Sequence, residues 1–269
     1  TVRDAKLCLY PSAPIAITEP VILTATSAIT TLLTCGAGNA AQPATVTVNG
    51  IGGTAPYQYS FDGGLNYTTI NTYQSNVGIT FDVFVKDAKG CLFTLPNGVN
   101  IPALVPPTDL SFVATAVTCL ALTSDVTLST TNGVGALSYA ILSPASATSN
   151  VSGASSGIFT GLSPDTYLFQ VTDANFCTYQ ESFTINPVTN ITVSGQLISD
   201  TTCNPGSNGE VQFVVSNFSG TYTYSINGGV ASAPQSNPTI TVSGINTASN
   251  QTIIVTDVIT GCTATTSIV

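Results

Sequence analysis

The sequence predicts an all-β protein built from tandem copies of one domain, and three observations support this. Val, Ile, Thr, Tyr and Phe, which favour strands, are abundant. Apolar residues make up 43% of the 269 residues, which is enough for packed cores. The amino-acid sequence also repeats with a period of about 85 residues, marked by its cysteines.

Two series of cysteines alternate along the chain. The early series, Cys35, Cys119 and Cys203, recurs every 84 residues. The late series closes four related segments, V-R-D-A-K-L-C at Cys8, V-K-D-A-K-G-C at Cys91, V-T-D-A-N-F-C at Cys177 and V-T-D-V-I-T-G-C at Cys262. Between them, P-Y-Q-Y-S-F-D-G-G from Pro56 matches T-Y-T-Y-S-I-N-G-G from Thr221 and, more loosely, A-L-S-Y-A-I-L from Ala136.

Proline-bearing junctions divide the repeats, because proline removes a backbone donor and interrupts a strand ladder. These junctions lie at Glu19-Pro20, Val105-Pro106-Pro107 and Asn186-Pro187. They predict repeats over residues 20–104, 105–187 and 188–269. Residues 1–19 correspond to the last strand of a preceding repeat, so the chain reads as a window on a longer protein.

Within a repeat, apolar and polar residues alternate as in half-buried strands. Residues 44–48, 57–61 and 81–85 show this period of two, and Asp62-Gly63-Gly64 and Asn227-Gly228-Gly229 supply tight turns. About seven short strands per repeat with regular turn signals favour an immunoglobulin-like Greek-key β-sandwich. We therefore expect tandem sandwiches of this type in a linear array.

Charge excludes several classes of function. Only 6% of the residues are charged, the net charge is −9, and the basic residues are four in number: Arg3, Lys6, Lys86 and Lys89. Binding to nucleic acid or to anionic lipids needs basic patches, so we expect neither. The chain lacks histidine and has no paired carboxylate or nucleophile motif, so we expect no enzyme activity and no cofactor.

Cysteine usage indicates the compartment. Seven cysteines without histidine or a C-x-x-C pair favour disulfides over zinc. Disulfides persist in oxidising surroundings, so we expect an extracellular, cell-surface protein. No apolar run is long enough for a spanning helix, so we expect no membrane insertion.

The repeat resembles the SprB-type repeat of gliding-motility adhesins and related surface proteins of Bacteroidota. The matching features are G-G-T-x-P-Y-x-Y-S at residues 52–60, T-Y-x-x-x-V-T-D-A-N at residues 166–175, and the early and late cysteines. Leu7 and Phe176 depart from it, since the family usually has glycine before the late cysteine. The resemblance implies export, surface display and service as a stalk or adhesive array.

The cysteines allow two pairing schemes. Pairing within each repeat joins Cys35 to Cys91, Cys119 to Cys177 and Cys203 to Cys262, and leaves Cys8 alone. Pairing between neighbours joins Cys35 to Cys177 and Cys119 to Cys262. We favour the first, although in an immunoglobulin-like order it requires a disulfide to link opposite poles, which lie about a strand length apart.

Two groups of side chains are candidate sites. The recurrent aspartates Asp4, Asp87, Asp173 and Asp257 are candidate turn caps, and the last three are weaker candidates for calcium ligands. Tyr57, Tyr59, Tyr222 and Tyr224 are expected in the core or at a corner, with an aromatic ligand platform as the alternative.

The function that follows is a non-catalytic structural or adhesive segment of a long secreted or cell-surface repeat protein. Its partners would be neighbouring repeats or other copies of the chain. One alternative is a filament subunit in which residues 1–19, with Leu7, Leu9, Ile15 and Ile17, complete a sheet in another chain. The other is a carbohydrate-binding module that recognises surface glycans through loop aromatics.

Overall fold

The computed structural model describes residues 1–269 except 12, 17, 202–206 and 247–248. The chain divides into two compact units, one of residues 1–105 with 175–177 and the other of residues 106–174 with 178–269. Three separate hydrophobic cores form, one in each predicted repeat. The described chain is all-β apart from two short 3₁₀ turns, η1 (Ala37–Asn39) and η2 (Ala145–Ala147).

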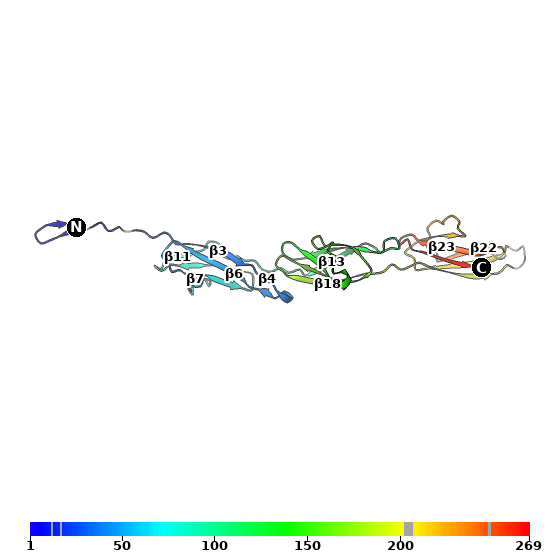
Figure 1. Ribbon diagram of the computed structural model, residues 1–269, viewed down its shortest axis with the longest axis horizontal. Coiled ribbons are helices and arrows are strands. Elements are labelled where there is room, and N and C mark those ends of the chain that lie inside the picture. Colours follow the sequence, from blue (N-terminus) through cyan, green and yellow to red (C-terminus); the bar gives the residue numbers. More distant parts are fainter. Residues whose placement is uncertain (12, 17, 202–206, 247–248) are drawn as a thin grey trace. The chain divides into compact units, whose positions relative to one another are not determined.

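In the first unit, the first repeat contains two three-stranded antiparallel sheets, with the orders β3-β6-β8 and β7-β10-β11. Two strand pairs, β4-β5 and β9-β12, supplement them. The strands are β3 (Thr24–Thr31), β4 (Thr34–Cys35), β5 (Ala41–Gln42), β6 (Ala44–Ile51), β7 (Gln58–Ser60), β8 (Thr72–Ser75), β9 (Ile79–Phe81), β10 (Phe84–Lys86), β11 (Leu92–Thr94) and β12 (Val99–Ile101) (Figure 1).

The second unit contains the other two repeats apart from residues 175–177, and the described part of each has six strands. The second repeat has β13 (Asp109–Ala114), β14 (Ser124–Thr131), β15 (Ser138–Ser143), β16 (Ile158–Leu162), β17 (Asp165–Thr172) and β18 (Thr178–Ile185). The third has β19 (Thr192–Ser199), β20 (Gly209–Ser216), β21 (Tyr222–Ile226), β22 (Thr239–Ile245), β23 (Gln251–Asp257) and β24 (Thr263–Ile268).

Strand order identifies the fold of these repeats. The sheets run β13-β14-β16 and β15-β17-β18, and the third repeat repeats this order with β19-β20-β22 and β21-β23-β24. The first, second and fourth strands therefore share one sheet, and the third, fifth and sixth share the other. This is the arrangement of an immunoglobulin-like Greek-key sandwich, as the sequence predicted.

Alternation along the central strands builds each core. In β6, Ala44, Val46 and Val48 are fully buried while the residues between them are partly exposed. The second and third repeats bury Val126, Leu128, Phe169 and Val171, and Val211, Phe213, Ile253 and Val255, from two facing sheets. Burying each such side chain contributes about 1.5–3 kcal/mol to stability relative to leaving it exposed. The buried residues at every second position therefore hold the two sheets together.

One predicted strand is divided in two. Residues 81–85 read as one strand, but β9 ends at Phe81 and β10 begins at Phe84. Phe81 pairs with Val99 of β12, whereas Val85 pairs with Tyr59 of β7. The chain therefore changes sheets at Asp82-Val83, and alternation alone cannot show this because both segments bury residues of the same parity.

The predicted glycine turns are present. Gly63 and Gly64 have φ of 79° and 84°, and Asn227 and Gly228 have φ of 52° and 71°. The Gly229 amide donates to the Ile226 carbonyl at 2.9 Å, which closes a four-residue turn. Two consecutive positive φ values match the right-handed twist of the flanking strands.

Residues 2–10 form a hairpin, within the segment 1–19 where a single strand was predicted. β1 (Val2–Arg3) pairs with β2 (Leu9–Tyr10) in antiparallel fashion. Leu7, Leu9 and Ile15 are exposed, and Ile17 lies outside the described residues. The segment thus includes the turn that ends at Cys8, with a strand on each side of it.

The predicted repeat boundaries fall between strands. No sheet pairing among the described residues crosses 19/20, 104/105 or 187/188, and the boundaries themselves stay predictions. No helix in the described part of the chain is long and apolar enough to cross a membrane.

Candidate functional site

Two disulfides join early cysteines to late cysteines of the following repeat. Cys35 bonds to Cys177 and Cys119 bonds to Cys262, with Cα separations of 4.8 and 5.0 Å. Residues 175–177 accordingly group with the first unit, and the Cys119–Cys262 bridge lies inside the second.

The favoured pairing within each repeat is therefore wrong. Cys119 lies between the first two strands of its repeat and Cys177 between the last two, and in this strand order those connections leave from opposite poles. A strand spans about 17–20 Å, whereas a disulfide needs Cα atoms about 4.4–6.8 Å apart. Cys91, predicted to bond to Cys35, is an exposed free thiol, as is Cys8. Cys203 lies outside the described residues.

Each late cysteine ends a turn that begins at one of the recurrent aspartates. We call this the late-cysteine turn, and its four copies span residues 4–8, 87–91, 173–177 and 257–262. In the first repeat, Asp87 Oδ1 accepts the amides of Lys89 and Cys91 at 2.9 and 2.8 Å. Asp87 Oδ2 accepts the Thr54 amide at 2.9 Å. The carboxylate thus caps its own turn and also holds the loop that follows β6.

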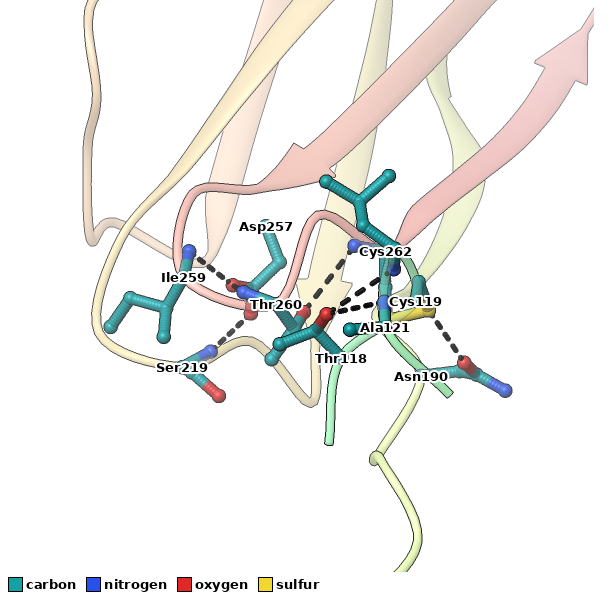
Figure 2. Close-up of a disulfide and its surroundings, with 10 residues drawn as sticks. Thr118, Cys119, Ala121, Asn190, Ser219, Asp257, Ile259, Thr260 and Cys262 are labelled. Carbon is teal, nitrogen blue, oxygen red and sulfur yellow. Dashed lines mark hydrogen bonds between the residues drawn. A yellow bond between two sulfur atoms is a disulfide. The ribbon is translucent and has the colours of Figure 1, made fainter. Parts of the chain in front are cut away.

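The third repeat uses the same arrangement, which Figure 2 shows around Cys119 and Cys262. Asp257 Oδ1 accepts the amides of Ile259 and Thr260, each at 2.8 Å, and Oδ2 accepts the Ser219 amide. In the second repeat, the Val134 amide donates to Asp173 Oδ2 at 3.1 Å. The sequence pattern did not reveal that the aspartate also accepts a hydrogen bond from the amide of a distant loop.

These contacts favour the turn-capping interpretation over calcium binding. Backbone amides direct their hydrogens at the oxygens of Asp87 and Asp257 that a cation would need. A calcium site takes six to eight oxygen ligands. In the part of the chain that the structure describes, no cluster of three or more Asp, Glu, His or Cys side chains occurs.

Hydrogen bonding also sets the charge state of these carboxyls. Burial of Asp257, which is 1% exposed, raises its pKa, but the amides of Thr260, Ser219 and Ile259 more than offset this. The pKa of Asp257 therefore lies below its ordinary value. The same balance between burial and the amides of Thr54 and Cys91 lowers the pKa of Asp87.

The residue before each late cysteine has a left-handed backbone. The φ values are 69° at Leu7, 84° at Gly90, 63° at Phe176 and 68° at Gly261. Glycine adopts this conformation without steric cost, whereas leucine and phenylalanine do not. The preference for glycine here is therefore a backbone requirement, and Leu7 and Phe176 satisfy it under strain.

The early cysteines bind to these turns through the backbone as well as through sulfur. The Cys35 amide donates to the Asn175 carbonyl at 2.8 Å, and the Cys119 amide donates to the Thr260 carbonyl at 2.9 Å. Both carbonyls lie two residues before the bonded late cysteine. Asn190 Oδ1 lies 3.5 Å from Cys119 Sγ (Figure 2). The two bridges therefore use one docking geometry.

The two covalent loops interleave. Cys119 lies within the loop that Cys35–Cys177 closes, and Cys177 lies within the loop that Cys119–Cys262 closes. The shortest covalent path from Cys35 to Cys262 therefore runs through both disulfides and the segment between Cys119 and Cys177. Most of the chain is bypassed by this path.

The tyrosine pairs belong to the cores, as expected. Tyr59 and Tyr222 are buried, at 7% and 0% exposure, while Tyr57 and Tyr224 are partly buried against the same clusters. The Tyr57 hydroxyl donates to the Gly52 carbonyl at 2.6 Å. These four tyrosines therefore do not form the flat ligand platform that was the alternative prediction.

An aromatic depression of about 230 Å³ lies beside Tyr59 in the first repeat. It is lined by Tyr59, Phe61, Asp62, Asn66, Tyr67, Thr68 and Tyr73. Phe61 and Tyr73 stack with ring centroids 5.5 Å apart, and the Lys86 ammonium lies 5.6 Å from the Tyr67 ring centre. All of the lining residues lie between residues 59 and 73, and the alternation that predicted a strand over residues 57–61 did not indicate the depression.

A carboxylate is fixed at the edge of this aromatic depression. The amide of Asn66, the Ser60 hydroxyl and the Asn66 side-chain amide lower the pKa of Asp62 to about 2. Asp62 is therefore ionised at neutral pH and held in one orientation beside the aromatic rings.

No family model matches the chain, and a comparison with curated proteins finds no match. Among solved structures, three N-terminal domains of the highly immunogenic outer capsid protein of bacteriophage RB49 are 11% identical, with a TM-score of 0.43 over 92% of this chain and 96% of that one. A C-terminal intimin fragment, solved with the intimin-binding domain of its translocated receptor, is 15% identical, with a TM-score of 0.35 over 66% and 67%.

Extracellular cadherin domains 1–4 of protocadherin gamma B7 are 13% identical, with a TM-score of 0.27 over 93% of this chain and 71% of that one. At these scores the likeness is confined to the general character of tandem β-sandwich domains. All three are similar in kind of fold, and the agreement extends no further.

Non-reducing peptide mapping should recover two cross-linked pairs, Cys35 with Cys177 and Cys119 with Cys262. Replacing Cys119 and Cys262 together by serine should lower the free energy of unfolding by about 2–4 kcal/mol, because the unfolded chain regains the freedom of a long loop. Urea denaturation followed by circular dichroism measures this. The matched control is Cys8→Ser, which should leave the transition unchanged. A Cys35–Cys91 peptide would contradict the pairing.

Acid should destabilise the fold through the aspartates whose pKa is lowered. The pKa of aspartate in the unfolded chain is about 3.9. The stability that Asp87 and Asp257 contribute is therefore fully present above that pH, and it is lost as the pH falls through their lower pKa values in the folded chain. Asp257→Asn should cost about 1–3 kcal/mol at pH 7 and flatten the loss of melting temperature between pH 4 and 2. Asp200→Asn, at an exposed position, is the control. An unchanged acid profile in Asp257→Asn would contradict the assignment.

Proposed function

We propose that this chain is a non-catalytic structural and adhesive segment of a secreted or cell-surface repeat protein. The observation that carries the proposal is the interleaving of the two disulfides. Each bridge joins one repeat to the next, so a pulling force is carried by covalent bonds as well as by sheets. A covalent path through the disulfides suits a tether whose length must change little under load.

Other observations support the same role. Disulfides persist outside the cell, and only 6% of the residues are charged. The chain lacks histidine, and within the described ranges no cluster of metal-ligating side chains forms. The resemblance to SprB-type repeats adds surface display, with neighbouring repeats as the first partners.

Single-molecule stretching from the two termini tests the proposal. With both bridges intact, only about 100 of the 269 residues lie on the shortest covalent path, so full extension should reach roughly 35 nm. The reduced chain should extend to roughly 90 nm. The remaining thiols are alkylated beforehand so that they cannot exchange.

Removing either bridge provides the matched control. Cys35→Ser with Cys177→Ser, or Cys119→Ser with Cys262→Ser, should each give roughly 45 nm, because about 130 residues then bear load. Equal extension of the oxidised and reduced chains would overturn the mechanical proposal.

The aromatic depression favours a second candidate function, binding of a neutral surface glycan. Tyr67 and Tyr73 offer apolar ring surface, while Asp62 and Asn66 offer fixed hydrogen-bonding groups. Sites for small ligands combine these two features, and sugars present both apolar faces and hydroxyls. The depression lies within one repeat, so it does not require the disulfides.

A glycan array probed with the intact chain tests this candidate. A bound oligosaccharide should lose at least tenfold in affinity with Tyr67→Ala, because the ring surface is removed. Tyr10→Ala, at a residue 76% exposed in the N-terminal hairpin, is the control. Binding that is unaffected by Tyr67→Ala, or the absence of any bound glycan, would overturn it.

A further inference from the structure

The hydrogen bonds that Asp62 accepts orient its carboxylate without neutralising its charge. Asp62 Oδ1 accepts the Ser60 hydroxyl at 2.7 Å and the amides of Leu65 and Asn66 at 3.1 and 3.0 Å. Asp62 Oδ2 accepts the Asn66 side-chain amide at 2.7 Å. All four donors are uncharged groups. A neutral glycan would use the hydrogen-bonding capacity of this carboxylate and leave its negative charge unused.

The polar edge of the aromatic depression therefore presents acceptors. An ionised carboxylate can only accept hydrogen bonds, so the nitrogen of the Asn66 side chain faces Asp62 and its oxygen is turned away from it. Asp62 Oδ2 accepts this one bond and keeps a second lone pair. Negative charge and acceptor oxygens together suit a ligand that carries positive charge.

Aromatic rings form the rest of the depression. Tyr59 is the most buried of them, at 7% exposure, and Phe61, Tyr67 and Tyr73 are partly buried. Tyr73 also contacts Phe81, with ring centroids 4.5 Å apart. The face of an aromatic ring carries negative potential and attracts cations. The rings and the carboxylate therefore favour the same kind of ligand.

The loop that carries these groups is already ordered. Tyr59 and Thr68 exchange two backbone hydrogen bonds, of 2.7 and 2.9 Å. This exchange joins the two ends of the segment that contains Asp62 and Tyr67. Asp62 holds the turn inside that segment through the amides of Leu65 and Asn66. A ligand would therefore lose little affinity to the ordering of the loop.

The Tyr67 ring already attracts one cation of the chain itself. The Lys86 ammonium lies 5.6 Å from the ring centre, within the range of about 6 Å for a cation–π contact. Lys86 is not among the residues that line the depression. Its ammonium therefore contacts the ring without filling the space between Tyr67 and Asp62.

We propose that the aromatic depression binds a quaternary ammonium cation of the choline class. The methyl groups of such a cation bury against the rings and need no hydrogen-bond acceptors, while its charge is balanced by Asp62. The volume of about 230 Å³ suits a headgroup of this size better than a drug-sized molecule. The net charge of −9 adds a long-range attraction for cations.

This inference goes beyond the glycan candidate and does not rest on it, because the probe carries no sugar. Choline and its uncharged isostere 3,3-dimethylbutan-1-ol, in which carbon replaces nitrogen, are titrated separately into the full chain by calorimetry. Choline should bind saturably in the millimolar range, and the isostere should bind at least tenfold more weakly. Hydrogen bonds lower the pKa of Asp62 to about 2, so choline affinity should be equal at pH 8 and pH 5.

Variants identify the groups that bind. Tyr67→Leu keeps an apolar side chain but removes the ring, and Asp62→Asn removes the charge, so each should weaken choline binding at least fivefold. Tyr67→Phe keeps the ring and should bind as the wild type does. The matched control is Asp82→Asn, which changes the net charge equally at an exposed residue outside the depression and should leave affinity unchanged. Circular dichroism verifies that each variant is folded.

Three results would overturn the proposal. They are equal affinity for choline and its isostere, choline binding that survives both Tyr67→Leu and Asp62→Asn, and no saturable binding of choline to the wild-type chain. The glycan candidate would stand after any of these if a glycan still bound and was lost with Tyr67→Ala. Choline binding without any bound glycan would support the present proposal and remove the glycan candidate alone.

Discussion

The order of strands in the sandwich is the constraint on which the covalent structure depends. With the first, second and fourth strands in one sheet and the third, fifth and sixth in the other, the first and last connections leave from opposite poles. The early and late cysteines of one repeat are therefore too far apart to bond. Cys35 and Cys119 instead bond to the late cysteine of the following repeat.

A second constraint makes this pairing reproducible. The aspartate of the late-cysteine turn accepts amides from its own turn and from a distant loop, at Thr54 in the first repeat and Ser219 in the third. The left-handed residue before the cysteine completes the turn. The turn at Cys91, a free thiol, has the same backbone hydrogen bonds as the turn at bonded Cys262, so the turn does not depend on a bridge. The same docking geometry recurs at Asn175 and Thr260.

Interleaved bridges and a low density of charge have complementary consequences. The bridges limit how far the chain can be extended, and a surface with few charges gives up little solvation when polar side chains meet other molecules. The first repeat holds Lys86 and Lys89, whereas no Lys or Arg follows Lys89 in the chain, and it also contains the aromatic depression around Tyr67.

The sequence by itself determined the all-β class, the repeat period and the core positions, because alternation such as that of Val46 and Val48 and turn pairs such as Asn227-Gly228 act locally. Tertiary structure alone decided the cysteine partners, the change of sheet at Asp82-Val83 and the loop held by Asp87. These depend on which strands pair and on which poles meet. Such relations join residues far apart in the chain, and no local pattern of residues encodes them.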